Sequence, residues 1–521
     1  MIIKKHHIRD FGAIGDGCAN DADAFAKASA FLNDGNENIQ KILVLDDATY
    51  KIGKISEEGV SHAISLCSAK NVSIEGNGAK IAIEMPTGGA HILDCENVTM
   101  RGIEMYFDPS PMVIGKVVAH DEGWSWIDVK VADGERCGIS ESGEYVPPKN
   151  SAFFATANGS EDDLNCRDDY FIEKMEFAGE NVIRVHINVS MMAGDLASHF
   201  EGLVYVGSEM VLPRVGYAHC VAGGSIPAIS VTRTDGFYMY DSHLHDIPLF
   251  CIGLASNGEV RFENVKLMHK EGSGNYLVSW RDGYHCKNQY KSATWENCEC
   301  GMLGDDIYNI ATTFFDVKEV VNGNTFKVYP QEGEIIQRFV PGDTVGFLDL
   351  HKGFSYGSSK IKSVTYGETR RDCVTIETED TIIGVKSGSV MEITYTADNP
   401  DGHYIRNCKL YGSIRVKAPT VFENCDLALT ILYINNESWI EGPIPQNIKV
   451  KNCYIHSTAA EDKLIVYVDV NGMSSTGYTY RAKDISIEDS TIIGTIRLNK
   501  NDVRIKNCIF PTALGEDSII R

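Results

Sequence analysis

The feature that most constrains this fold is a short unit that recurs along the chain, in which an alternating strand ends at an Asn or Gly turn. Two such units, NVSIEGNGAKIAI from Asn71 and NVTMRGIEM from Asn97, follow each other closely. Similar units are GFYMYDSHLHD from Gly236, VRFENVKL from Val260, ATWENCEC from Ala293, HYIRNCKLYG from His403, TVFENCDL from Thr420, IKVKNCYI from Ile448, ISIEDSTI from Ile485 and VRIKNCIF from Val503. A repeat of roughly 20 to 30 residues is typical of a solenoid. We therefore expect an elongated all-β protein, a parallel β-helix that grows coil by coil.

The dipeptide Asn-Cys ends five of these strands, at Asn297-Cys298, Asn407-Cys408, Asn424-Cys425, Asn452-Cys453 and Asn507-Cys508. In a parallel β-helix each coil makes the same turn at the same place. We predict that the Asn side chains, which tolerate a left-handed turn, and the small buried Cys side chains stack in ladders. Metal binding by these thiols is the alternative, but a second matching C-x-x-C pair is absent.

The rhythm changes in three parts of the chain. The segment from Ile8 to Gly35 predicts a short strand, a Gly-Asp-Gly turn and an amphipathic capping helix with Asp21 or Asp23 at its start. Residues near 106–215 and 312–398 show hairpin-like alternation, which predicts two inserted small β-barrel-like domains. We therefore divide the chain into 1–105 (cap and first coils), 106–215 (first insertion), 216–311 (central coils), 312–398 (second insertion) and 399–521 (last coils).

Charge and composition limit the partners of the chain. The formal net charge of −24 disfavours nucleic acid and anionic polysaccharides, so a neutral glycan is the expected substrate. No stretch resembles a signal peptide or a membrane-spanning run, which predicts a protein that stays in the cytoplasm without a membrane partner. The fifteen cysteines are expected to be thiols in a reducing compartment. A homodimer is compatible with the sequence, which does not fix the oligomeric state.

Two segments carry a resemblance to known proteins. DFGAIGDG from Asp10, followed by the predicted helix and VLDDATYKI, resembles the opening of the pectate-lyase-like right-handed β-helix superfamily. The stretch SWRDGYHCKNQYKSATWENCECGMLGDDIYNI, 279–310, resembles the catalytic region of glycoside hydrolase family 110, bacterial exo-acting α-1,3-galactosidases. Members carry an Asp-Gly-x-His element one coil before an Asp-Asp pair. The residues after the pair, including Ala311-Thr312-Thr313, depart from that pattern, which leaves the sugar open.

The candidate catalytic carboxylates are Asp282, Asp305 and Asp306. Asp282 and Asp305 are 23 residues apart, about one coil, so they can lie on neighbouring strands spaced about 4.8 Å apart. Consecutive residues of a regular strand point to opposite faces, so Asp305 and Asp306 can converge only if the backbone bends; Gly304 makes this feasible. Crowded carboxylates raise the pKa of one member, which supplies the acid that glycoside hydrolysis needs beside a carboxylate.

The resemblance implies roles for these residues. Asp305 is expected to be the general acid, and Asp282 and Asp306 to hold the attacking water, which gives inversion at the anomeric carbon of a terminal α-linked galactose. Inverting enzymes usually separate acid and base by about 6.5 to 9.5 Å. The candidate sugar contacts are Trp280, Arg281, His285, Tyr308 and Asn309. We assign no cofactor and no metal ligand.

Several alternatives remain open. Asp282-Gly283 and Asp305-Asp306 can be ordinary turn residues. His243 and His245 lie on one face of a predicted strand. Such a pair can bind a metal ion, but such histidines are more often hydrogen-bonded turn residues or line a groove. A polygalacturonase- or lyase-like enzyme for uronic acids needs a cluster of basic residues beside the acids. Arg281 and Lys287 are the basic residues that the sequence offers there, which supports this alternative only weakly. A non-catalytic glycan-binding β-helix predicts that the three aspartates do not cluster.

Overall fold

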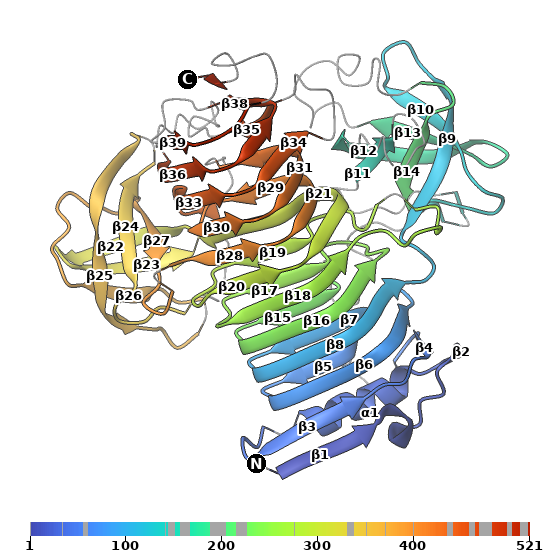
Figure 1. The fold of residues 1–521 in the computed structure, drawn as a ribbon, viewed down its shortest axis with the longest axis horizontal. Helices are drawn as coiled ribbons and strands as arrows, with labels where there is room; N and C mark the ends of the chain where they lie inside the picture. The colour runs from blue at the N-terminus through green and yellow to red at the C-terminus, as the bar shows by residue number, and fades with distance from the viewer. Residues whose placement is uncertain are drawn as a thin grey trace.

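The computed structural model describes most of the chain, namely residues 2–33, 35–55, 61–140, 142–143, 152–156, 167–187, 205–214, 227–275, 277–330, 338–350, 352–369, 371–399, 401–434, 441–457, 464–467, 482–497, 503–510 and 519–520. These residues form a right-handed parallel β-helix with one capping helix and two closed six-stranded barrels (Figure 1). The predicted fold class is therefore confirmed.

Three parallel sheets run the length of the helix, because each coil pairs with the next coil in register. The sheet that carries the site, here the site sheet, contains β5 (His62–Cys67), β7 (Gly88–Leu93), β15 (Ile229–Thr232), β17 (Ile252–Ala255), β19 (Tyr284–Lys287), the ends of β21 (Glu299–Thr313), β29 (Lys409–Val416) and β31 (Asp426–Tyr433), then β35 (Leu464–Tyr467), β38 (Thr495–Arg497) and β40 (Ile519–Ile520).

The second sheet contains β1 (Ile2–His7), β3 (Ile39–Val44), the starts of β6 (Lys70–Ile83), β8 (Glu96–Phe107), β16 (Asp235–His245) and β18 (Val260–Leu267), then β20 (Ala293–Glu296), β28 (His403–Arg406), β30 (Thr420–Glu423), β33 (Gln446–Lys451), β36 (Lys483–Glu488) and β39 (Val503–Lys506). The third contains β2 (Asp16–Asn20), β4 (Thr49–Ile52), the remaining halves of the long strands, β34 (Tyr454–Ser457) and β37 (Thr491–Ile493). Alternate side chains of all three sheets fill one continuous apolar core, from Ile8 to Ile496.

Stacked Asn side chains mark the turns between the second and third sheets. The Asn residues of the repeated units have positive φ, for example +53° at Asn407 and +57° at Asn424. The Asn424 amide donates to Asn407 Oδ1 at 3.4 Å, and Asn452 donates to Asn424 Oδ1 at 2.7 Å. The next residue of four of these pairs is a buried free Cys, and Cys508 is half-buried. The predicted ladders are therefore confirmed.

The N-terminal end is closed as solenoids require. The 3-10 turn η1 (Ile8–Phe11) buries Ile8, and the helix α1 (Ala22–Leu32) packs Phe25 and Ala28 against the first coil. Asp21 stands at the N-cap, but its carboxylate makes no cap hydrogen bond to the helix. It accepts instead from the backbone N–H groups of Ile14 and Gly15 at 2.6 and 3.0 Å, so it fixes the Gly-Asp-Gly turn.

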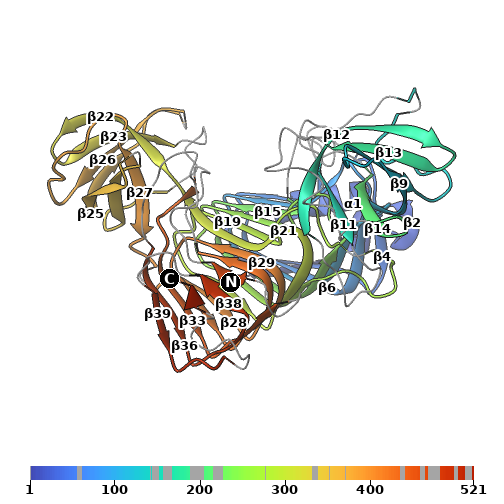
Figure 2. The ribbon, with the colours of Figure 1, turned by 90° about the horizontal axis from the view of Figure 1, so that it is seen from above.

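Two closed antiparallel barrels interrupt the helix where the Asn-turn rhythm stops. The first contains β9 (Met112–His120), β10 (Trp126–Lys130), β11 (Ala152–Thr156), β12 (Arg167–Gly179), β13 (Val182–Ile187) and β14 (Glu209–Pro213). The second contains β22 (Phe315–Asn322), β23 (Thr325–Pro330), β24 (Thr344–Asp349), β25 (Phe354–Thr365), β26 (Val374–Thr378) and β27 (Val390–Tyr395). Each barrel has its own apolar core, and the two lie on opposite sides of β19, β21 and β29 (Figure 2). No helix of the described residues is long and apolar enough to span a membrane.

The Asn ladder predicts a graded loss of stability. We expect Asn424→Ala to lower the free energy of unfolding by roughly 2 kcal/mol, because Ala strains the left-handed φ and removes two ladder hydrogen bonds. Asn424→Gly removes the same hydrogen bonds but tolerates the φ, so it is expected to cost less. Urea denaturation of both variants checks this order, and equal losses would show that backbone strain is irrelevant there.

Candidate active site

Three neighbouring strands of the site sheet align their outward-facing residues in rows. The register pairs His285 of β19 with Asn309 of β21, and Asn309 with Arg415 of β29. The residues that precede them in each strand, including Tyr284 and Tyr308, are buried in the core. Because side chains alternate along a strand, His285, Asn309 and Arg415 share the outer face of the sheet.

Asp282 lies two residues before the first residue of β19. Its backbone carbonyl accepts from the N–H of Cys251 in the preceding coil at 3.0 Å, and the N–H of Gly283 donates to the Asp306 carbonyl in the following coil at 2.9 Å. A Cβ at position 283 would lie 2.9 Å from both Cys300 Sγ and the Ile307 carbonyl oxygen. The glycine of the Asp-Gly pair is therefore required by the close approach of two coils.

Asp305 and Asp306 converge because β21 bulges before them. Gly301 pairs with Tyr411 and Asp306 with Ser413, so five steps along β21 match only two along β29. A second shift follows between Asp306 and Tyr308. The bend expected from the sequence is present, but the residue with positive φ is Met302 (+57°), not Gly304.

The three carboxylates form one cluster. One oxygen from each of Asp282, Asp305 and Asp306 lies within 4.8 Å of the others. Asp282 and Asp306 are each only 2% exposed, whereas the Asp305 side chain is 36% exposed. This limit joins the nearest oxygens, so the 6.5 to 9.5 Å between the acid and base carboxyl groups of inverting enzymes stays a prediction for this site.

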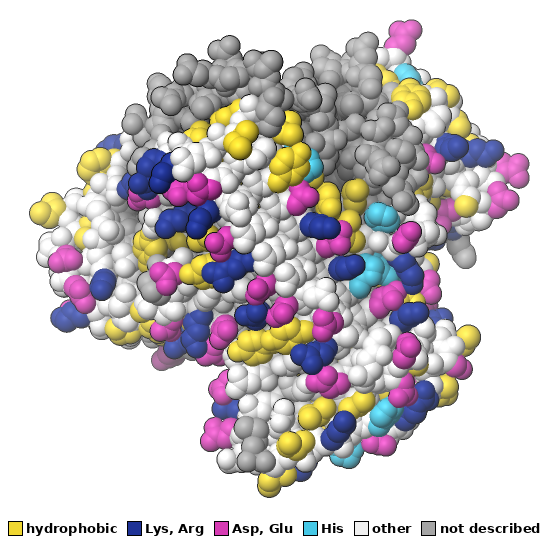
Figure 3. Space-filling view, viewed as in Figure 1, with side chains coloured by type: hydrophobic (Ala, Val, Ile, Leu, Met, Phe, Trp, Pro, Cys, Tyr) yellow, Lys and Arg dark blue, Asp and Glu magenta, His cyan; other side chains and the backbone are white. Residues whose placement is uncertain are grey.

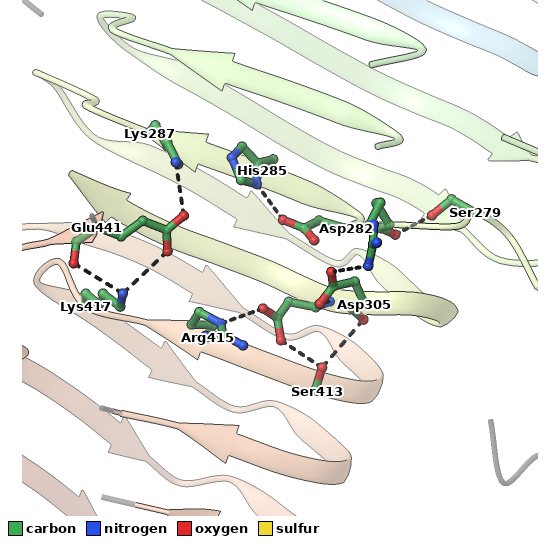
Figure 4. Close-up of polar contacts among 11 residues, drawn as sticks. Ser279, Asp282, His285, Lys287, Asp305, Ser413, Arg415, Lys417 and Glu441 are labelled. Carbon is green, nitrogen blue, oxygen red and sulfur yellow. Dashed lines mark hydrogen bonds and ion pairs between the residues drawn. The ribbon is translucent and has the colours of Figure 1, made fainter. Parts of the chain in front are cut away.

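Each carboxylate has a cationic or hydrogen-bonding partner (Figure 4). His285 Nδ1 lies 2.6 Å from Asp282 Oδ2, and Arg281 donates to Asp305 Oδ2 at 3.1 Å. Asp306 has both oxygens engaged, Oδ1 by the Ser413 hydroxyl and Oδ2 by Arg415 Nε, each at 2.8 Å. These contacts offset the mutual repulsion of the three acids and hold them in place.

Burial raises the pKa of Asp306 to about 6. The Arg415 guanidinium acts in the opposite direction and lowers this pKa, whereas the negative charge of Asp282 raises it further. Burial therefore outweighs the arginine. A carboxyl group that titrates near neutrality is suited to accept a proton during a reaction.

Two of the expected sugar contacts belong to the interior. The Tyr308 ring is fully buried and stacks on Tyr284 at a centroid distance of 5.2 Å. Trp280 is 1% exposed and packs against Met112 and Val211 of the first barrel. The sequence around these two residues does not distinguish a buried aromatic ring from a surface one. The bulge in β21 directs the Tyr308 ring inward, and the first barrel covers the Trp280 ring. We therefore correct both assignments to packing roles.

Ser413 and Arg415 were not expected from the sequence. They follow Asp306 by 107 and 109 residues because the second barrel intervenes, so no spacing signal connects them with the aspartates. The same is true of Glu441, in β32 (Glu441–Gly442), which pairs antiparallel with the end of β21. Its carboxylate contacts Lys287 Nζ at 3.0 Å and Lys417 Nζ at 3.4 Å.

His243 and His245 do not share a metal site. His243 Nε2 contacts the Met268 carbonyl at 2.8 Å, while His245 lies between Asp246 Oδ2 and Glu104 Oε1 at 2.7 and 3.1 Å. In the described part of the chain, the Asp282, Asp305 and Asp306 cluster is the one group with the geometry to hold a metal ion. Those carboxylates already have the partners given above.

Two curated relatives are similar to the chain in sequence. Alpha-1,3-galactosidase B of Akkermansia muciniphila is 19% identical over 420 residues, 76% of this chain and 49% of that protein. Alpha-1,3-galactosidase A of Shewanella woodyi is 20% identical over 412 residues, 75% of this chain and 64% of that protein. The chain therefore spans about half the length of the first and less than two-thirds of the second. The resemblance to α-1,3-galactosidases is confirmed. No protein-family model matches the chain.

Solved structures resemble the chain only distantly. The A-module of mannuronan C-5 epimerase AlgE4 from Azotobacter vinelandii matches with a TM-score of 0.40 and 11% identity, over 97% of this chain and 95% of that one. An exopolygalacturonase from Thermotoga maritima matches with a TM-score of 0.39 and 12% identity, over 97% and 91%. Neither similarity assigns a reaction.

The raised pKa of Asp306 predicts a stability effect that depends on pH. Because this pKa lies above that of the unfolded chain, the favourable contribution of the protonated carboxyl is complete below about pH 4 and is lost as pH rises through about 6. We therefore expect the free energy of unfolding of Asp306→Asn, relative to that of wild type, to rise by about 2 kcal/mol between pH 4.5 and pH 7.5. Urea denaturation of both proteins at the two pH values measures this change.

A matched control separates this effect from the loss of an ion pair. Asp128 of the first barrel is held by Arg184 at 2.7 and 2.8 Å, so Asp128→Asn also removes an arginine partner. The Asp128→Asn variant therefore measures the loss of an arginine partner away from the cluster of acids. If the Asp306→Asn difference is constant from pH 4.5 to 7.5, Asp306 does not have the pKa assigned to it.

Proposed function

We propose that the protein is a glycoside hydrolase that releases a terminal sugar, α-linked galactose, from neutral glycans by inversion, with Asp282, Asp305 and Asp306 as its catalytic residues. The observation that carries this proposal is the meeting of one partly exposed and two buried carboxylates beside β19 and β29. Similarity to α-1,3-galactosidases over three quarters of the chain supports the choice of sugar.

Asp305 is assigned as the general acid because it is the most accessible of the three, and a general acid has to meet the glycosidic oxygen of the substrate. It donates its proton as the bond between the anomeric carbon and that oxygen breaks. Pairing with Arg281 favours the ionised form of Asp305, so this role requires Arg281 to release Asp305 when the glycan binds. Arg281 then becomes available to a sugar hydroxyl.

Asp306 and Asp282 are assigned to hold and activate the attacking water. A base with a pKa close to the working pH accepts a proton effectively, and burial gives Asp306 this property. Both Asp306 oxygens and one Asp282 oxygen already accept hydrogen bonds, which suits orienting a water molecule better than direct attack on carbon. Water then adds opposite the leaving group, and the anomeric configuration inverts.

The charges around the site favour a neutral substrate. The four described cations nearby, Arg281, Arg415, Lys287 and Lys417, each pair with a site carboxylate, so positive charge is matched by negative charge. Figure 3 draws the face of the second sheet, on the other side of the β-helix from the site; there too, acidic and basic side chains of the described residues are interspersed. The site still contains more cations than the sequence indicated, which keeps a polygalacturonase- or lyase-like enzyme for uronic acids as the second candidate.

The reaction is tested by hydrolysis of α- and β-linked galactosides, including α-1,3-galactobiose, with the released anomer followed by NMR. We expect wild type to release the inverted sugar and Asp305→Asn to lose at least 100-fold in kcat/KM, because the leaving group is no longer protonated.

Asp426→Asn is the matched control. Asp426 pairs with His456 on the third sheet, outside the site, so this variant is expected to keep wild-type activity. Release of the retained anomer would overturn the water-holding roles. Turnover of oligogalacturonides alone would favour the second candidate, and full activity of Asp305→Asn would remove Asp305 from the mechanism.

Arg415 predicts a shift in the pH profile. Arg415 lowers the pKa of Asp306, so Arg415→Gln raises that pKa and protonates Asp306 over a wider range. If ionised Asp306 is the base, the acidic limb of kcat/KM moves to higher pH by about one unit or more. Arg415→Lys keeps the charge and is expected to restore most of the profile. Arg184→Gln, which removes the partner of Asp128 in the first barrel, is expected to leave it unchanged.

A further inference from the structure

A second row of outward side chains lies two residues further along the three site strands. Lys287 of β19 pairs with Ala311 of β21. Lys417 stands directly after β29, two residues beyond Arg415, and its N–H donates to the Ile310 carbonyl of β21 at 2.9 Å. Two residues along a strand correspond to about 6.6 Å, and adjacent strands lie about 4.8 Å apart. The two rows therefore form a polar strip on the sheet that starts at the aspartates and ends at the lysines (Figure 4).

Glu441 closes the far end of this strip. The strand β32 pairs antiparallel with β21, Gly442 with Thr312 and Glu441 with Thr313, so it lies beside the end of β21. Glu441 Oε1 contacts Lys287 Nζ at 3.0 Å, and Oε2 contacts Lys417 Nζ at 3.4 Å. The small side chain of Ala311 stands between the two lysines in the register, which leaves room for the carboxylate to bridge them.

The ion pairs keep Glu441 charged in a buried place. Burial alone would raise the pKa of Glu441, but Lys417 and Lys287 outweigh it and lower this pKa to about 2. Lys417 is fully buried, whereas the Glu441 side chain keeps 10% of its surface exposed. The carboxylate is therefore ionised and fixed, and it faces the strip with acceptor capacity beyond its two lysine contacts.

A second acceptor lies between Glu441 and the aspartates. Asn309 is 8% exposed, and its Oδ1 has no hydrogen-bond partner in the described structure. It belongs to the row of His285 and Arg415, one step from the row of Lys287 and Lys417. A buried acceptor without a donor is costly, so a ligand that brings hydroxyl donors to this row would relieve that cost.

We propose that Glu441, fixed by Lys287 and Lys417, is a specificity-determining residue that accepts hydrogen bonds from hydroxyl groups of the terminal sugar, with Asn309 Oδ1 as the neighbouring acceptor. This inference rests on the proposed function, because it places one sugar ring between the catalytic aspartates and Glu441. A carboxylate that accepts from a sugar hydroxyl discriminates strongly against an analogue that lacks this hydroxyl, since the charged acceptor is then left unpaired.

The test is binding of methyl α-galactoside and its 2-, 3-, 4- and 6-deoxy analogues, measured by titration calorimetry with wild type and Glu441→Gln. We expect Glu441→Gln to weaken binding of the parent glycoside about tenfold or more, as for a hydrogen bond to a charged group. With at least one deoxy analogue, the variant and wild type are expected to bind equally, because the hydroxyl that Glu441 accepts from is absent.

Control variants separate recognition from folding. Glu423 on β30 also lies between two cations, Arg406 at 3.5 Å and Lys451 at 3.9 Å, but on the second sheet, so Glu423→Gln is expected to bind like wild type. Glu441→Gln leaves Lys417 buried without a carboxylate. If this variant does not fold, the double variant Glu441→Gln with Lys417→Met removes both buried charges and takes its place.

The outcomes distinguish this inference from the proposed function. Equal weakening for every analogue, unchanged binding in the variant, or no binding of any analogue to wild type overturns the role of Glu441. Hydrolysis of the galactosides is measured separately. Selective weakening without hydrolysis supports the role of Glu441 in sugar recognition and contradicts the proposed reaction, whereas hydrolysis with equal weakening contradicts only the role of Glu441.

Discussion

The in-register stacking of parallel coils is the constraint on which the rest of this structure depends. It repeats each backbone position in the next coil about 4.8 Å away, so that residues from distant parts of the chain become direct neighbours. The same geometry produces the apolar core, the Asn ladder and the row of His285, Asn309 and Arg415. Chemistry on such a sheet is built by placing compatible residues at the same position of successive coils.

The clustered carboxylates repel one another, and side chains from the neighbouring coils offset this repulsion by pairing with them. Asp282 and Asp306 are buried within reach of each other, and burial raises the pKa of Asp306 to about 6. His285 and Arg415 each contact one of these acids. The result is a site whose acids differ in exposure and in partners, which allows them to act as different groups in one reaction.

The sequence was informative wherever the repeat was regular. It predicted the β-helix, its cap, the two inserted barrels and the Asn and Cys ladders, because each leaves a periodic or compositional signal. The spacing of one coil between Asp282 and Asp305 also predicted that these two residues lie close together. The sequence misassigned Trp280 and Tyr308, because the bulge in β21 and the contact with the first barrel decide which face each ring takes. Arg415 and Glu441 had no signal, since the second barrel separates them from the aspartates.

The most direct test of the central claim is a crystal structure of Asp305→Asn soaked with α-1,3-galactobiose. The account predicts one sugar ring on the outer face of β19, β21 and β29, with the Asp306 carboxylate and an ordered water on one side of the anomeric carbon and position 305 on the other. A disaccharide bound elsewhere on the molecule, or an anomeric carbon out of reach of all three positions, would contradict it.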